Sequence, residues 1–590
     1  MIKTPLILLS IVSLPIHADI LIKASKLETS KEKITSDVTV ITAQEIEDSG
    51  ATTLQELLQG RSSVFIPQTG GLGSIASFNL RGLPTGFSKV IIDNIELVDP
   101  TDINNSFQVN NLLLENIESI EILKGSQSIL YGSNAVGGVL KINTKKGHKN
   151  NSLNLEYGSL NTVKAGLQSS GNSDKLNYGL SASYLSSDGY SAVNEDRIEN
   201  AEDDSFKNLN LNLNLSYLLN EQLELNYQGQ LLDSEVEIDG FESTPPYGPI
   251  DVVENDLNEY LQSNHYLGFN YFSEDEKLTI TPSIRYSHIK REDPTNSFTP
   301  LYKGNETQAK LDIKYKHTQN LSLLSGVEYT KQEDEVENSQ SELYSVYTAA
   351  NLSLEKWFYD LGLRFDDFSS IQSNNSNVIG SAGAGYRINN EISLKAHISQ
   401  GFKLPTLYQL ANQVDDLKPT DSINTEFIFS YNTIMSQFEA AIFNYDLKNQ
   451  IDYDTTVFGY DNIAKSQIQG IELNHSIEFK NSFNIKTSLT FQRAKNETDD
   501  SDLLRTPKQL GSLILGYQLS KNQRLINNWQ YVGKRKDVGG ELPSYIVGNF
   551  TYHYKNFSFK VLNILDKKYE NVEYYGTMPR SYYLSYKLSF

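Results

Sequence analysis

Residues 209–217 read LNLNLNLSY, so an apolar or aromatic residue alternates with a polar one through the whole stretch. Successive side chains of a β-strand point to opposite faces, and a period of two therefore predicts a two-faced strand. The apolar face would carry Leu209, Leu211, Leu213, Leu215 and Tyr217. The same alternation recurs at 153–157 and 311–315, which predicts β-structure from about residue 150 onward.

Turn-forming clusters of Asn, Asp, Ser and Glu separate these segments, as at 172–174 and 273–275. Long polar stretches, such as 187–205 and 234–258, separate other segments. Short turns that alternate with long loops are typical of outer-membrane β-barrels. A soluble β-sandwich or propeller is the alternative, but the polar strand face shows no sign of packing against a second sheet.

The composition and the N-terminus favour the same structure. Of 590 residues, 35 are Tyr and 25 are Phe, and none is Cys, which excludes disulfides and thiolate metal sites. Residues 1–18 are typical of a secretory signal, with Lys3, an apolar core at 5–14 and a small residue, Ala18, at the end. The core is too short to span a bilayer as a helix, and no later segment is apolar enough. A membrane crossing would therefore need a closed barrel.

The C-terminal residues 582–590 alternate as well, and the chain stops at Phe590. An amphipathic strand that ends in Phe resembles the closing strand of bacterial outer-membrane barrels. At roughly 20 residues per strand and loop, the chain after residue 150 is long enough for about 22 antiparallel strands. We therefore predict an all-β transmembrane barrel at 149–590.

Residues 25–148 have a different pattern. A short amphipathic helix is predicted at 53–59, followed by short strands near 78–80, 89–92, 117–122 and 139–142. Gly-rich loops separate these strands. The segment is predicted to be a mixed α/β domain that fills the lumen of the barrel.

Glycine-containing motifs in this domain resemble the plug of the TonB-dependent receptor family. Residues 122–126 (ILKGS) and 130–139 (LYGSNAVGGV) resemble the end of the plug, although Lys124 and Ser126 stand where Arg and Pro are usual. Residues 79–82 (NLRG) fit the pattern too. The resemblance covers the whole chain. It implies a monomeric importer in the outer membrane of a Gram-negative bacterium, surrounded by lipid and energised by the TonB protein and its inner-membrane complex.

The segment 19–24 follows the predicted cleavage site and looks like the coupling box of this family, the segment that pairs with TonB as an added strand: Asp19, Ile20, Leu21, Ile22, Lys23 and Ala24. Backbone hydrogen bonds would supply the affinity of this pairing, and alternating side chains would set its register. A frayed N-terminus with some strand propensity is the alternative interpretation.

Within the family, the chain is most similar to the cobalamin (corrinoid) receptors, through stretches such as 66–73, 462–472 and 503–505. The resemblance implies two plug apices, at 68–77 and 99–106, that face an extracellular funnel. It also implies a set of ligand contacts on the plug and, with the last two residues, on the barrel: Gln68, Ile75, Ser77, Pro84, Asp99, Asp102, Ile103, Gly240 and Arg505.

The charge of the apices bears on the cargo. Neither apex contains Lys or Arg, whereas a strongly anionic ferric siderophore needs cations or hydrogen-bond donors when it loses its water. This favours a large, nearly neutral corrinoid. A siderophore receptor is the alternative if barrel loops supply the charge, for example Lys534, Arg535 and Lys536. Haem is less favoured because 402–425 contains no His, and a passive porin predicts neither a plug nor a coupling box.

Two predicted loops are crowded with carboxylates, at 195–204 and 233–242. Oxygen ligands of this kind favour calcium over zinc. The resemblance implies structural Ca²⁺ in extracellular loops, bound by Glu202, Asp204, Asp233 and Asp239. The usual Gly-Tyr-Asp of the family reads GYS at 189–191, so one site would be weakened or rebuilt around Glu195 or Asp196. A solvated acidic surface is the alternative.

Nothing in the sequence indicates an enzyme. The eight His residues are scattered without metal-ligand spacing, and no Gly-x-Ser-x-Gly elbow is present. We therefore assign no catalytic residues. The net charge of −22 argues against a nucleic-acid partner, whose phosphates would require Lys and Arg.

Overall fold

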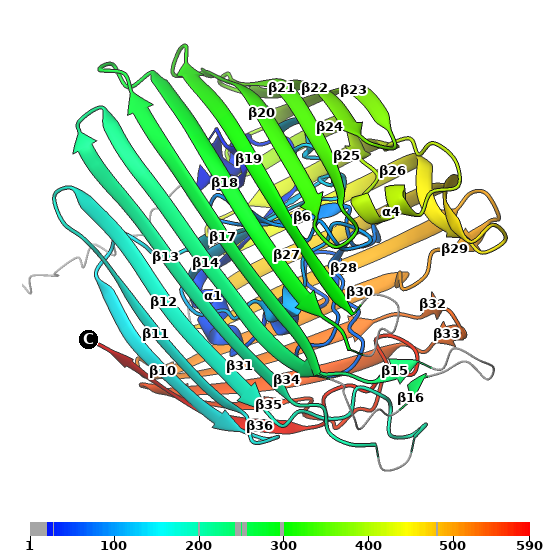
Figure 1. The fold of residues 1–590 in the computed structure, drawn as a ribbon. Coiled ribbons are helices and arrows are strands. Elements are labelled where there is room, and N and C mark those ends of the chain that lie inside the picture. Colours follow the sequence, from blue (N-terminus) through cyan, green and yellow to red (C-terminus); the bar gives the residue numbers. More distant parts are fainter. Residues whose placement is uncertain are drawn as a thin grey trace, which may run out of the picture.

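The computed structural model describes residues 21–27, 29–198, 201–241, 249–250, 257–294, 300–479 and 482–590. Within these residues, 22 antiparallel strands close into a barrel, and the N-terminal domain lies inside it (Figure 1). This confirms the predicted fold class, including the number of strands. No helix in the described part of the chain is long and apolar enough to cross a membrane.

The first half of the wall consists of β10 (Asn150–Gly158), β11 (Val163–Asn172), β12 (Leu176–Ser187), β13 (Phe206–Asn220), β14 (Leu223–Glu237), β17 (Leu257–Phe272), β18 (Leu278–Glu292), β19 (Leu301–Lys316), β20 (Leu321–Asp334), β21 (Ser339–Ser353) and β22 (Trp357–Ser370). The second half consists of β23 (Asn374–Arg387), β24 (Ile392–Lys403), β25 (Thr420–Asn432), β26 (Ser436–Asp454), β27 (Gly459–Phe479), β28 (Phe483–Asn496), β30 (Gln509–Ser520), β31 (Gln523–Val532), β34 (Tyr545–Tyr554), β35 (Phe557–Leu562) and β36 (Ser581–Ser589).

Short elements lie on the loops between wall strands: β15 (Gly240–Phe241), β16 (Pro249–Ile250), α4 (Leu407–Ala411), β29 (Ser501–Asp502), β32 (Arg535–Asp537) and β33 (Gly540–Leu542). They lie at the end of the barrel opposite the C-terminus (Figure 1). The longer connections thus gather at one end of the barrel, as predicted. We call this the loop end, and the other the turn end.

The first and last wall strands close the barrel. Leu155 of β10 pairs with Tyr586 of β36 in an antiparallel register. The backbone N–H of Phe590 also donates to the carbonyl oxygen of Asn151 at 3.0 Å. Closure satisfies the backbone groups that an open sheet edge would expose, which is a requirement in lipid. The alternating C-terminus is therefore the closing strand that the sequence predicted.

The polar face of β13 contacts the N-terminal domain. Asn208 donates from Nδ2 to the carbonyl oxygen of Asn111 at 3.1 Å, and Asn214 donates to Oγ1 of Thr144 at 3.0 Å. Both asparagines are buried, whereas Tyr217 on the apolar face is exposed. The alternation seen in the sequence therefore separates a face toward the plug from a face toward the outside.

The plug contains a five-stranded mixed sheet in the order β3-β8-β9-β6-β7, in which only β6 and β9 run parallel. These strands are β3 (Val38–Thr42), β6 (Ser88–Ile92), β7 (Ile95–Leu97), β8 (Ile117–Lys124) and β9 (Gly138–Thr144). The other elements are β1 (Leu21–Ile22), η1 (Lys23–Ser25), β2 (Thr29–Ser30), η2 (Lys31–Lys33), α1 (Ala43–Ser49), α2 (Leu54–Leu58), β4 (Val64–Phe65), β5 (Asn79–Leu80), η3 (Val109–Asn111) and α3 (Ser128–Tyr131).

The predicted helix at 53–59 is α2, which the side chain of Thr53 caps by accepting from the N–H of Glu56. Its apolar residues Leu54, Leu57 and Leu58 are fully buried in the plug core. The four predicted strands correspond to β5, β6, β8 and β9. The local pattern was therefore sufficient to predict the plug as a mixed α/β unit.

Candidate functional site

The first apex, 68–77, is a tight loop that its own backbone holds together. The N–H of Thr69 donates to the carbonyl oxygen of Ile75 at 3.0 Å, and the N–H of Ser77 donates to that of Pro67 at 3.0 Å. The Gln68 side chain is buried and donates within the loop to Gly71. By contrast, the Ile75 side chain is 54% exposed at the apex. Of the predicted contacts on this loop, Ile75 is the one that offers an apolar surface.

Gly73 lets this apex approach the wall. Its φ of +83° lies in the left-handed region, and a Cβ at this position would lie 2.2 Å from the ring of Phe206 at the start of β13. Only glycine combines that backbone conformation with such close contact at little cost. The apex is therefore fixed against the wall.

The second apex, 99–106, uses its two acidic residues internally. Oδ1 of Asp102 accepts from the N–H groups of Asn104 and Ser106 at 2.9 and 3.0 Å. Asp99 is buried, accepts from Thr101 and lies 3.7 Å from the guanidinium of Arg291. Burial raises the pKa of the Asp99 carboxyl above its ordinary value. Neither carboxylate therefore extends from the apex as an isolated charge.

Ile103 is the exposed residue of the second apex, with 41% of its surface accessible. Its carbonyl oxygen accepts from Oγ1 of Thr406 at 3.0 Å, and Thr406 is the N-cap of α4. The apex is thus joined to a loop of the barrel wall. Ile75 and Ile103 give each apex one exposed aliphatic side chain.

The remaining predicted contacts lie around these apices or on barrel loops. Ser77 and Pro84 are half-buried, and Gly240 begins the short hairpin of β15 and β16. Nε of Arg505 pairs with Oδ1 of Asp537 at 3.0 Å. The Arg505 guanidinium is therefore neutralised by a neighbouring loop.

Two cations named for the siderophore alternative are also engaged. Lys534 pairs with Glu541 at 2.9 Å. Arg535 is buried and donates to backbone carbonyl oxygens, including that of Asn571 at 3.3 Å. Arg535 thus ties the β31–β34 loop to the loop that precedes β36. Both side chains are already committed to contacts within the protein.

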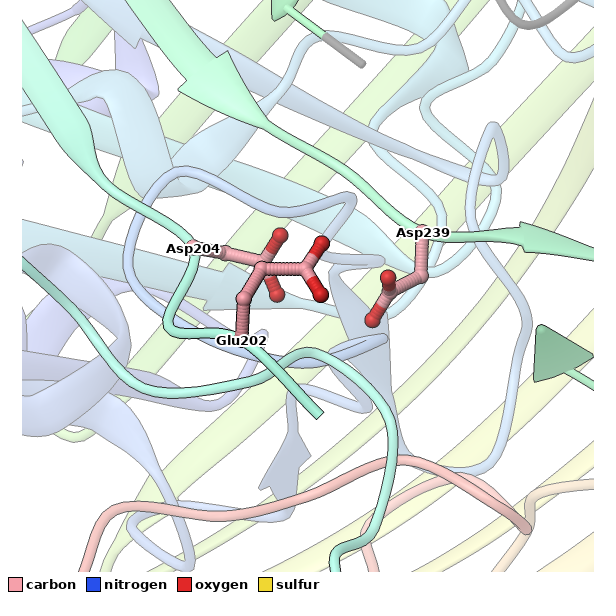
Figure 2. Close-up of side chains that lie close together, drawn as sticks. All are labelled: Glu202, Asp204 and Asp239. Atoms are coloured by element: carbon pink, nitrogen blue, oxygen red, sulfur yellow. The ribbon is translucent and has the colours of Figure 1, made fainter. Parts of the chain in front are cut away.

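Three of the four predicted calcium ligands converge (Figure 2). Glu202 and Asp204 precede β13 and Asp239 follows β14, and one carboxylate oxygen of each lies within 4.8 Å of the others. Asp204 accepts from the N–H of Ala192, and Asp239 accepts from the N–H of Val193 at 2.9 Å. An all-oxygen, triply acidic donor set fits a hard divalent cation such as Ca²⁺.

Asp233 does not join this cluster. It is exposed on β14 between Leu232 and Ser234, which are both buried toward the lumen. Because side chains alternate along a strand, Asp233 points outward. Asp196 is likewise separate, since it pairs with Lys568 at 2.5 Å. The structure thus brings together Glu202, Asp204 and Asp239 and leaves Asp233 outside.

The predicted coupling segment lies partly outside the described residues, which exclude Asp19 and Ile20. Its second half is docked on the plug. Leu21 and Ile22 form β1, which pairs with β2. Ile22 and Ala24 are fully buried against Ile34, Val38 and Leu123. Lys23 lies 3.6 Å from Glu118. In this conformation the segment is folded against the domain that it would have to leave.

The sequence did not predict a buried ion cluster at the junction of plug and barrel. Arg81 contacts Asp37 and Glu426 at 2.6 Å each and Glu472 at 3.3 Å. Lys124 contacts Asp37 at 3.1 Å and also Glu472. All five side chains are fully buried. The sequence offered one indication of this cluster, a charged residue on the lumen-facing side of a strand. Glu426 shares that side of β25 with Ser422 and Asn424.

The two cations of the cluster favour the ionised form of Asp37. Burial alone would raise the pKa of Asp37, but Lys124 and Arg81 outweigh it and hold the pKa well below its ordinary value of 3.8. Loss of one partner from such a cluster leaves an uncompensated buried charge, which lowers the stability of the fold by about 3–5 kcal/mol. The cluster therefore locks the plug to β25 and β27.

These features define the class of protein. Residues 30–139 match the family model described as TonB-dependent Receptor Plug Domain, and residues 324–564 match the model described as TonB dependent receptor-like, beta-barrel. The chain belongs to the TonB-dependent receptor family. The protein is thus an outer-membrane receptor of a Gram-negative bacterium.

Individual relatives differ in what their names say they carry. The chain is 26% identical to the Vitamin B12 transporter BtuB of Vibrio cholerae, over 96% of this chain and 94% of the relative. It also resembles the siderophore receptor PirA of Acinetobacter baumannii, with a TM-score of 0.80, 18% identity, and 95% and 99% of the two chains covered. The ferric enterobactin receptor PfeA of Pseudomonas aeruginosa gives 0.79 and 16%, with 95% and 99% covered. At identities of 18% and 16%, these two structural likenesses establish a shared fold alone.

Proposed function

We propose that this receptor imports cobalamin or a related corrinoid across the outer membrane. The observation that carries the proposal is the 26% identity with a vitamin B12 transporter along 96% of the chain. The chemistry of the funnel supports it. Each apex presents an aliphatic side chain, Ile75 or Ile103, and the cation of Arg505, the predicted contact on the barrel, is paired with Asp537. A large ligand with little net charge suits such a surface better than a compact polyanion.

Import of a ferric siderophore is the second candidate, supported by the structural likeness to PirA and PfeA. Titration of the purified receptor decides between them. Cyanocobalamin should bind, whereas ferric enterobactin should give no signal. The reverse result would overturn the corrinoid assignment and leave the receptor class intact.

We further propose that Glu202, Asp204 and Asp239 bind one structural Ca²⁺ that orders the loops before β13 and after β14. Their donor chemistry and mutual distances support this, and Asp233 would not contact the ion. Bound calcium would offset two of the three negative charges of these carboxylates. The two loops would then be held close to the first apex, because the hydroxyl of Tyr190 donates to the carbonyl oxygen of Gly70 at 3.2 Å.

The proposed coupling step uses residues 19–24. This segment would pair with TonB by strand addition, which requires an accessible backbone edge. Since Ile22 and Ala24 are buried in the docked conformation, cargo must favour a state in which the segment is released. TonB would then pull the segment and rearrange the plug, with the receptor acting as a monomer in outer-membrane lipid.

Deletion of residues 19–24 tests this step. Uptake of cyanocobalamin by cells should stop, while the purified variant should bind cyanocobalamin as the parent does. Retained uptake would overturn the coupling assignment.

A further inference from the structure

Two plug side chains hold both backbone polar groups of Ala24 in the coupling segment. The hydroxyl of Tyr131 donates to the carbonyl oxygen of Ala24 at 2.8 Å, and Oε2 of Glu121 accepts from its N–H at 2.8 Å. Ala24 is fully buried. Undocking the segment must therefore break two buried hydrogen bonds, which is costly unless both groups find water at once.

Tyr131 is the last residue of α3, and the residues after α3 are attached to the barrel wall. The N–H of Leu404 donates to Oγ of Ser133 at 2.9 Å, and the N–H of Asn134 donates to the carbonyl oxygen of Phe402 at 3.2 Å. The helix also contacts wall strands β21 to β24. A displacement of the segment after β24 therefore acts directly on α3.

The same wall segment reaches the second apex. Two residues beyond Leu404, Thr406 donates to the carbonyl oxygen of Ile103 at 3.0 Å and caps α4. Three tertiary hydrogen bonds thus connect the exposed apex to the coupling segment: Thr406 to Ile103, Leu404 to Ser133, and Tyr131 to Ala24. The intervening links are one or two residues of continuous chain.

We propose that Tyr131 is the positioning residue that couples occupancy of the second apex to release of the coupling segment. Cargo on Ile103 displaces the Thr406 segment, α3 moves with Ser133, and the Tyr131 hydroxyl leaves Ala24. This inference rests on the proposed function for the nature of the cargo. The contact between Tyr131 and Ala24 does not depend on that assignment.

The experiment uses the absence of cysteine from the natural chain. Ile22→Cys places a single thiol at a fully buried position of the coupling segment, and its rate of reaction with a maleimide reports undocking. A second reporter, Leu21→Cys with a nitroxide spin label, leaves the buried packing intact because Leu21 is exposed. Both reporters are measured in the full-length receptor.

Tyr131→Phe removes the hydroxyl and keeps the ring. Loss of one buried hydrogen bond shifts a two-state equilibrium by about fivefold, so labelling without cargo should accelerate by about fivefold. Tyr445→Phe is the matched control, since this buried tyrosine donates to another plug carbonyl oxygen, that of Gly137. It should label at the parent rate. An unchanged rate in Tyr131→Phe with both reporters would overturn the proposal.

Thermodynamic linkage between cargo binding and release of the coupling segment predicts the effect of the variant on affinity. If cargo favours the released state, a variant that is already released should bind cyanocobalamin up to about fivefold more tightly. Thr406→Val should label at the parent rate without cargo and lose the acceleration that cargo causes, and Thr406→Ser should restore it. Weaker binding by Tyr131→Phe, or a full cargo response in Thr406→Val, would overturn the proposed route.

The two assignments fail separately. If cyanocobalamin does not bind the parent receptor, the corrinoid assignment fails, and the cargo arm is run with the ferric siderophore that binds. The cargo-free comparison of Tyr131→Phe with Tyr445→Phe still decides whether Tyr131 holds the segment.

Discussion

Arg81 of the plug donates from Nη1 to Oε1 of Glu426 in the barrel at 2.6 Å, and both side chains are fully buried. This pair joins residues 345 positions apart in the chain. It places a cation of the NLRG motif against the inner face of the barrel wall.

Arg81→Met should loosen the plug more than any single neutralisation of its partners. The substitution leaves Lys124 as the one cation of the cluster beside Asp37, Glu426 and Glu472. The free energy of unfolding should therefore fall by about 3–5 kcal/mol. Limited proteolysis and the thermal unfolding of the plug measure the effect. The double variant Arg81→Met/Glu426→Gln should recover part of the loss, because it removes one uncompensated charge. A double variant less stable than Arg81→Met would contradict this account.

Acid should weaken the contribution of Asp37. Its pKa in the folded protein is depressed, so its stabilisation is fully present above the ordinary value of 3.8 and declines as the pH falls below that value. The difference in melting temperature between the parent and the Asp37→Asn variant should therefore be larger at pH 6 than at pH 3. Asp99→Asn is the control of opposite sign. Because the pKa of Asp99 is raised in the folded protein, the parent should gain stability relative to this variant as the pH falls. If the difference between the parent and Asp37→Asn instead grows on acidification, the ion-pair explanation is excluded.

Calcium binding should depend on three carboxylates and not on the fourth. Asp239→Asn keeps an acceptor for the N–H of Val193 but removes a charge, and should weaken Ca²⁺ binding by about tenfold. Asp233→Asn should bind Ca²⁺ as the parent does, because Asp233 points away from the cluster. Isothermal titration with CaCl₂ measures both variants. Equal weakening by the two substitutions would show that the ion lies elsewhere.

Gly73→Ala should distort the first apex. A left-handed φ costs an alanine about 1–2 kcal/mol, and its Cβ would also meet the ring of Phe206 at 2.2 Å. Cyanocobalamin affinity should therefore fall by about tenfold. Adding Phe206→Ala should recover part of it, because that change relieves the contact and leaves the backbone strain. Gly71→Ala, where φ is not in the left-handed region, is the control and should retain most of the affinity.

The barrel and the plug could be predicted from the amino-acid sequence without any tertiary information. The LNLNLNLSY strand, the closing strand at Phe590 and the glycine motifs are local patterns, and local geometry fixes which faces alternate and where the chain turns. The convergence of Glu202 and Asp204 with Asp239 was also foreseen, through family resemblance. The fourth residue, Asp233, was misplaced relative to them because one step along a strand reverses the direction of a side chain.

The contacts between distant segments became visible only in the folded molecule. Asn208 and Asn214 face the plug, Arg81 meets Glu426, and Tyr131 holds Ala24. The two partners in each of these contacts are far apart in the sequence, and each contact depends on how the plug is rotated within the closed barrel. The docking of the plug depends on all wall strands together, so no local pattern encodes these contacts. The alternation of side chains and the chemistry of turns depend on a few neighbouring residues. Burial and charge pairing depend on contacts across the whole lumen.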